Sequence, residues 1–319
     1  MRIAFLTPLA GLVAIAVILP LVAFARGQQR AARVRSLLRL APPGASSRQT
    51  IVVIVVLALL VGVGAAQPVL EERRDHPART DVHAFFLVDT SRSMHAAPAA
   101  GEATRFERAV AAARRVRAGL PGLPVGLASL TDRVLPMVFP SANPGTFDRV
   151  LRHSLGVDRP PSREANNTRA SALDATIVVP ERNFFRGPRR RLLVVFTDAE
   201  SQRLHPLRLE NRFRDSGIET ILVRIGTPDE RIYRAGGAVE PYQPDPGSAA
   251  MADAYAQAVG GRAFAEDELD DAIDAARSAI GSGRSIRRIE ASDVRPLGPF
   301  VFLVALVPLS FLLWRRNIG

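Results

Sequence analysis

The sequence has no cysteine and no lysine among its 319 residues, and acidic residues are missing from both of its ends. Without cysteine, the chain cannot form a disulfide framework, a thiolate zinc site or a cysteine nucleophile. All 42 basic residues are arginine, the first acidic residue is Glu71, and the last is Asp293. Between those positions 32 arginines accompany all 31 acidic residues, so the formal net charge of +11 comes from the ends. This distribution indicates membrane topology and argues against nucleic acid as a partner.

Three long apolar runs occupy the ends of the chain. Residues 3–25, 50–70 and 297–314 form runs of 23, 21 and 18 residues without a charge. As helices they would span roughly 27–35 Å, which matches a hydrocarbon core of about 30 Å. The sequence therefore predicts three transmembrane helices in a lipid bilayer, at residues 1–25, 50–70 and 297–314.

Arginines beside these runs predict the orientation of the chain. Arg315 and Arg316 follow the third run, and six more lie between the first two: Arg26, Arg30, Arg33, Arg35, Arg39 and Arg48. Positive residues favour the cytoplasmic side. We therefore expect a basic cytoplasmic loop at 26–49, a cytoplasmic tail at 315–319, and residues 71–296 outside the plasma (cytoplasmic) membrane of a multi-pass protein.

A cleaved signal peptide is the alternative for the first run. Ala23-Phe24-Ala25 resembles a small-x-small cleavage site. The apolar run is longer than such peptides usually have, and Arg2 is the one basic residue before it. Either interpretation leaves residues 71–296 outside the membrane.

The sequence predicts one α/β domain at 81–280 in the middle of the chain, between linkers at 71–80 and 281–296. Short apolar runs alternate with segments of helical pattern, which is typical of a doubly wound, Rossmann-like parallel sheet. Strands are expected at 82–88, 125–130, 134–139, 191–197 and 219–225. Helices are expected at 105–118, 147–155, 171–178, 204–215, 248–259 and 269–280, with a loop at 227–247.

Two of the predicted strands end in an acidic residue, Asp89 and Asp198. In an open α/β sheet, ligands bind beyond the carboxyl ends of the strands. The first strand continues as Asp89-Thr90-Ser91-Arg92-Ser93, which can turn three oxygens toward one point. Oxygen ligands suit hard cations such as Mg²⁺, and two neighbouring carboxylates repel each other without a cation.

These residues resemble the metal-ion-dependent adhesion site of von Willebrand factor A (VWA) domains. Asp-x-Ser-x-Ser after an apolar strand is the first element of that site, a loop threonine matched by Thr168 is the second, and a strand-terminal aspartate matched by Asp198 is the third. The resemblance implies a VWA fold in which Asp89, Ser91, Ser93, Thr168 and Asp198 hold Mg²⁺, with Mn²⁺ or Ca²⁺ as alternatives. It also implies that an acidic residue of a protein partner completes the coordination shell.

The sequence departs from the family pattern at two places. Asn166-Asn167 precedes Thr168 where many relatives have glycine, and Ala199 follows Asp198 where many have glycine. Neither change removes an oxygen ligand. Ala199 would strain the loop if its position requires a positive φ.

The arrangement of two N-terminal spans, an exported domain and one C-terminal span resembles the Bat-type aerotolerance proteins. That resemblance implies an association with a MoxR-type AAA+ ATPase and with other VWA membrane proteins, in the assembly or maturation of an envelope complex. The function expected is therefore metal-dependent protein binding without enzymatic activity.

Two alternatives share the same residues: a metal-assisted hydrolase, and a metal-free scaffold with a vestigial site. The motif has no histidine near it apart from His95, and the chain has no Gly-x-Ser-x-Gly elbow or Walker A loop. An acidic run at 266–274 could hold a second cation, but its place at a helix start is explained more simply by the helix dipole.

Overall fold

The computed structural model describes residues 2–17, 47–159, 171–185, 187–234 and 236–317, with short pieces at 22, 26–27, 29–30, 33–34 and 37–38. The chain divides into two compact units. One comprises Met1–Arg74 and Ala291–Gly319, and the other comprises Asp75–Glu290.

The second unit contains a sheet of six strands in the order β5-β4-β3-β6-β7-β8. These are β3 (Val82–Asp89), β4 (Val125–Leu130), β5 (Val134–Ser141), β6 (Arg190–Thr197), β7 (Ile218–Arg224) and β8 (Arg262–Ala265). All neighbouring pairs are parallel except β4 and β5. Counted along the chain, the order is 3-2-1-4-5-6, the doubly wound order that reverses direction between β3 and β6. The predicted sheet is confirmed, with an antiparallel edge strand and with β8, which the sequence analysis did not predict.

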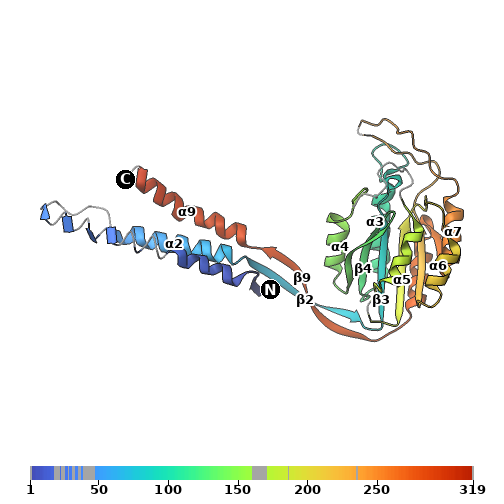
Figure 1. Cartoon of the computed structure of the whole chain (residues 1–319), viewed down its shortest axis with the longest axis horizontal. Helices are drawn as coiled ribbons and strands as arrows, with labels where there is room; N and C mark the ends of the chain where they lie inside the picture. Colours follow the sequence, from blue (N-terminus) through green and yellow to red (C-terminus); the bar gives the residue numbers. More distant parts are fainter. Residues whose placement is uncertain are drawn as a thin grey trace. The chain divides into compact units, whose positions relative to one another are not determined.

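Helices cover both faces of this sheet (Figure 1). One core lies under α3 (Arg105–Gly119), α4 (Pro144–His153) and α8 (Leu269–Ile280). The other lies under the 3-10 helix η3 (Leu173–Ile177), α5 (Val178–Glu181), α6 (Pro206–Phe213) and α7 (Ser248–Val259). Phe86 of β3 points into the first core and Phe85 into the second. Because both faces are covered, the central strands β3, β4 and β6 are mostly buried apolar runs rather than alternating ones.

The helix α3 begins with a capping box. The Thr104 hydroxyl accepts a hydrogen bond from the Glu107 amide at 3.2 Å, and the Glu107 carboxylate accepts one from the Thr104 amide at 2.8 Å. These bonds satisfy amides that a helix start otherwise leaves free. They fix Arg105 as the first helical residue, at the edge of the sheet where the strands β3 and β6 end.

The chain enters and leaves the second unit at neighbouring points. Arg79 donates to the carbonyls of Gly281 and Ile280 at 2.5 and 3.0 Å, and Arg190 donates to the carbonyl of Ile280 at 2.9 Å. The amide of Thr80 donates to the carbonyl of Arg284 at 3.1 Å. The bonds of Arg79 and Thr80 tie the segment before β3 to the end of α8 and the residues after it, and Arg190 ties the start of β6 to the same helix end. Residues 71–80 and 281–296, expected as linkers, lie in or beside the strands β2 (Pro68–Arg79) and β9 (Ser285–Pro296).

The first unit contains β1 (Arg2–Phe5), the 3-10 helix η1 (Pro8–Val17), α2 (Ser47–Ala65) and α9 (Gly298–Asn317). Among the described residues one helix is long and apolar enough to cross a membrane, over Gly298–Arg315 of α9. The sequence predicted three such helices, and the described residues contain one. The apolar part of α2, Gln49–Ala65, is shorter than the predicted span at 50–70 because β2 begins at Pro68. The described part of the predicted span at 1–25 holds β1 and η1, and residues 1, 18–21 and 23–25 lie outside the described residues.

Two glycines let α2 approach its neighbours closely. A Cβ atom at Gly62 would lie 2.7 Å from the Cβ of Ala14 in η1. A Cβ atom at Gly64 would lie 2.7 Å from the ring of Phe302 in α9. Small residues at such crossings let apolar helices pack backbone to backbone.

We predict that Gly64→Ala lowers the melting temperature of the full chain in detergent. Overpacking of this kind typically costs about 1–3 kcal/mol. Gly27→Ala is the matched control, since a Cβ atom at Gly27 meets nothing within 4 Å. Adding Phe302→Leu to Gly64→Ala should restore the loss, and equal melting temperatures for the two glycine variants would contradict this packing.

Candidate metal centre

The two strand-terminal aspartates lie where the sheet order reverses. The strands β3 and β6 are parallel neighbours with Val88 opposite Phe196, so Asp89 and Asp198 follow at the same edge. Asp89 is 0% exposed and Asp198 is 2% exposed. Burial of two acidic side chains at a topological switch point is the arrangement expected of a ligand site in this type of fold.

The serines of the motif fold back toward Asp89. The Ser91 amide donates to Oδ1 of Asp89 at 2.8 Å, and the hydroxyls of Ser91 and Ser93 lie 3.0 Å apart. Both serines are buried, and a 3-10 turn, η2 (Arg92–His95), follows Ser91. The structure thus brings Asp89, Ser91 and Ser93 together, as the sequence predicts.

Asp89 lies in an environment that disfavours its charge. Burial, together with the nearby charge of Asp198, raises the pKa of Asp89 to about 7. The bonds to its two oxygens come from neutral donors, the Ser91 amide at 2.8 Å and the Thr197 hydroxyl at 2.5 Å. A cation between the two carboxylates would supply the missing positive charge.

The donor set fits a hard divalent cation. Two carboxylates and two serine hydroxyls are oxygen ligands of the kind that Mg²⁺ and Ca²⁺ take. The described residues contain no group of three or more His, Cys, Asp or Glu side chains that could hold a metal ion. The motif would instead hold its ion with two carboxylates, Asp89 and Asp198, and two hydroxyls, Ser91 and Ser93.

Thr168, the fifth predicted ligand, lies outside the described residues. The described chain resumes at Ser171, beside the loop that follows Asp198. The Ser171 hydroxyl donates to the carbonyl of Glu200 at 3.0 Å, and the Leu173 amide donates to the Ser201 hydroxyl at 2.9 Å. The segment that follows Thr168 is therefore attached to the Asp198 loop.

Ala199 has a left-handed backbone. Its φ is +59°, and its side chain is fully buried. The position therefore has the positive φ that would strain an alanine, as the sequence analysis considered. An L-residue in this conformation costs roughly 1–2 kcal/mol.

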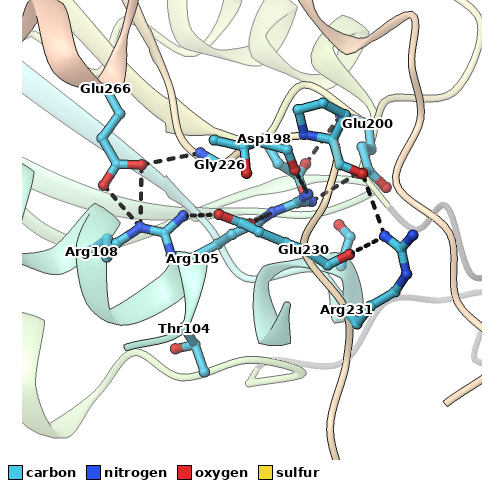
Figure 2. Close-up of polar contacts among 12 residues, drawn as sticks. Thr104, Arg105, Arg108, Asp198, Glu200, Gly226, Glu230, Arg231 and Glu266 are labelled. Carbon is cyan, nitrogen blue, oxygen red and sulfur yellow. Dashed lines mark hydrogen bonds and ion pairs between the residues drawn. The ribbon is translucent and has the colours of Figure 1, made fainter. Parts of the chain in front are cut away.

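A buried arginine, which the sequence analysis did not single out, lies beside Asp198 (Figure 2). Arg105 is 2% exposed. Its Nη1 donates to Oδ2 of Asp198 at 3.0 Å, to Oε1 of Glu200 at 2.8 Å and to the hydroxyl of Tyr242 at 2.9 Å. Its Nε donates to Glu230 at 2.5 Å. Burial opposes the charge of Arg105, but the surrounding carboxylates outweigh burial and raise its pKa.

The network continues to a second arginine. Arg108 donates to Oε1 of Glu230 at 2.5 Å and to Oε1 of Glu266 at 2.9 Å. Glu266 also accepts a hydrogen bond from the Gly226 amide at 3.1 Å. The interpretation of Glu266 as a purely dipole-stabilising residue was therefore incomplete, because its side chain pairs with Arg108.

One sequence signal could have pointed to Arg105. The start of a helix carries partial positive charge and favours acidic residues. An arginine at the first helical position is therefore unfavourable unless carboxylates surround it. Its partners Glu200 and Glu230 come from loops 95 and 125 residues further along the chain, so no local pattern identifies them.

We predict that Ala199→Gly lowers the free energy of unfolding less than Ala96→Gly does. The difference between the two losses should be about 1 kcal/mol. Both alanines are fully buried loop residues, but Ala96 has a φ of −62°. Each variant loses one methyl group and gains the flexibility of glycine, so the difference reports the strain at Ala199. The measurement is chemical unfolding of the full chain in detergent, followed by circular dichroism; an equal loss in both variants would show that the loop is unstrained.

A scan against protein-family models found no match, and a search of curated proteins found none either. Among solved structures, the conserved hypothetical protein BatB from Bacteroides thetaiotaomicron matches at 16% identity, covering 63% of this chain and 100% of that chain with a TM-score of 0.50. An aerotolerance-related membrane protein from Bacteroides fragilis NCTC 9343 matches at 20% identity, covering 62% and 98% with a TM-score of 0.49. Proximal thread matrix protein 1 from the mussel byssus, with a zinc-occupied MIDAS motif, matches at 12% identity, covering 64% and 49% with a TM-score of 0.40. Of these three matches, the one to BatB has a TM-score that reaches 0.50. It shows that the chain has the α/β fold of a Bat-type protein.

Proposed function

We propose that this chain is a membrane-anchored VWA domain that binds a protein partner through a divalent cation. The cation, Mg²⁺ with Mn²⁺ or Ca²⁺ as alternatives, would be held by Asp89, Ser91, Ser93, Thr168 and Asp198. An acidic residue of the partner would take the open coordination position. The bond to the partner would then depend on the ion and be lost in chelator.

The observation that carries this proposal is the burial of Asp89 beside Asp198, with Ser91 and Ser93 folded toward the same point. Two buried carboxylates cost free energy unless a positive charge accompanies them. Arg105 pairs with Asp198, whereas Asp89 has neutral donors. A bound cation would relieve Asp89 and use the serine hydroxyls as further ligands.

The membrane arrangement is part of the same proposal. The helix α9 is long and apolar enough to span a bilayer, and arginines follow it. We place residues 71–296 outside the cytoplasmic membrane, because the basic loop 26–49 and tail 315–319 favour the inside. The Bat-type fold favours a role in assembling or maturing an envelope complex, with a MoxR-type AAA+ ATPase and other VWA membrane proteins as partners.

We propose no enzymatic role. A hydrolase would need a base to activate water beside the ion. His95, the histidine nearest to the motif in the sequence, is exposed on the turn η2, whereas Asp89 and Asp198 are buried. The geometry therefore favours binding over turnover.

We predict that 10 mM Mg²⁺ raises the melting temperature of the full chain in detergent and does not raise that of Asp89→Asn. A Kd of about 1 mM would add about 1.4 kcal/mol, which corresponds to roughly 3–6 °C for a domain of this size. Asp270→Asn is the control, since that side chain is 76% exposed and pairs with Arg115 on the surface. A shift that persists in Asp89→Asn would place the ion elsewhere, and no shift with Mg²⁺, Mn²⁺ or Ca²⁺ in the unaltered chain would favour the metal-free scaffold.

A further inference from the structure

Four carboxylates are buried beyond the carboxyl ends of the strands β3, β6 and β7, around the proposed metal centre. Asp89, Asp198, Glu200 and Glu230 are 0, 2, 4 and 1% exposed. Three of them contact the guanidinium of Arg105, and the fourth, Asp89, is bonded to neutral donors. The charge of Arg105 is therefore divided among several acids, one of which is a proposed metal ligand.

The nitrogens of Arg105 divide these contacts in a particular way. Nη1 is shared by Asp198, Glu200 and the Tyr242 hydroxyl, whereas Nε bonds to Glu230 at 2.5 Å. Glu230 and Asp198 therefore contact different nitrogens of the same guanidinium. The contact of Arg105 with Glu230 therefore limits how closely the guanidinium can approach Asp198.

Glu230 belongs to the loop between β7 and α7, which is attached to the metal loop at several points. The backbones of Ala97 and Arg231 exchange hydrogen bonds of 2.9 and 3.0 Å. Glu240 accepts hydrogen bonds from Arg92, between the two motif serines, at 2.7 and 3.0 Å. Tyr242 donates to Glu200 at 2.6 Å. These bonds attach the β7–α7 loop to the two loops that follow Asp89 and Asp198.

We propose that Glu230 is a positioning residue that sets the ion affinity of the metal centre through Arg105 and so couples the β7–α7 loop to the ion. This inference rests on the proposed metal-binding function. Arg105 and the ion compete for the carboxylate of Asp198, since both are cations. While Glu230 holds Nε of Arg105, the guanidinium is kept from a closer pairing with Asp198, and the carboxylate of Asp198 stays available to the ion.

The test is a Mg²⁺ titration of the full chain in detergent, with the melting temperature as readout, for three proteins. In Glu230→Gln we expect the Kd for Mg²⁺ to rise by roughly fivefold or more, in the range usual for coupled sites. Glu266→Gln is the matched control, because it removes the same charge from the same network but its described contacts are Arg108 and the Gly226 amide. Its Kd should stay within about twofold of the unaltered chain, well below usual coupling.

A second variant guards against misfolding of Glu230→Gln. Tyr242 is partly exposed, and its hydroxyl accepts from Nη1 of Arg105 and donates to Glu200. Tyr242→Phe removes one acceptor of Nη1, so Arg105 should hold Asp198 more strongly and the Kd should rise as in Glu230→Gln. Equal Kd values in Glu230→Gln, Tyr242→Phe and Glu266→Gln would overturn the proposal.

Failure of this inference can be separated from failure of the proposed function. If the unaltered chain shows no Mg²⁺ response, the proposed function fails, and the link through Arg105 is then tested without metal. A double-mutant cycle of Asp198→Asn and Glu230→Gln should show non-additive losses in melting temperature in chelator, because both residues bind one guanidinium. Additive losses would show that Arg105 does not connect them.

Discussion

The burial of carboxyl groups where β3 and β6 end is the constraint on which the rest of this edge of the sheet depends. Asp89 and Asp198 are brought there by the register of two neighbouring parallel strands. Their neighbours must therefore supply amides, hydroxyls or positive charge. The Ser91 amide and the Thr197 hydroxyl donate to Asp89, and Arg105 donates to Asp198. The hydroxyls of Ser91 and Ser93 lie beside each other in the same loop. A divalent ion would complete this set rather than rearrange it.

Arg105 occupies a position that a helix alone would not favour. The dipole of α3 opposes a cation at its first residue, and the capping box at Thr104 and Glu107 fixes the backbone that holds it there. The stabilisation comes from three carboxylates that two separate loops, those after β6 and β7, bring to one guanidinium. Removing one partner of a buried ion group is costly because the others are left unpaired. The network therefore joins the loops after β6 and β7 and the start of α3 into one electrostatic unit.

Much of the sheet and part of the site could be predicted from the sequence, because both depend on local patterns. Apolar strands that end in Asp89 and Asp198 are visible in the sequence, and the strained position of Ala199 followed from comparison with the family pattern. The partners of Arg105 could not be predicted, since they lie in loops whose positions depend on the assembled fold. Hydropathy predicted apolar segments but not the end of α2, where Gln67 adopts a φ of +51° and Pro68 starts a strand. The short strand β8 begins with Arg262, which broke the apolar pattern.

The hydrogen bonds of Arg79, Thr80 and Arg190 have a mechanical meaning. They fasten both ends of the second unit together next to the amino end of β3, while the proposed ion lies at the carboxyl end of the same strand. A partner that pulled on the ion would load β3 along its length. In that direction the rows of hydrogen bonds to β4 and β6 resist sliding together, rather than opening one at a time. The proposed ion and the joined ends of the second unit thus lie at opposite ends of the strand that is hydrogen-bonded on both sides.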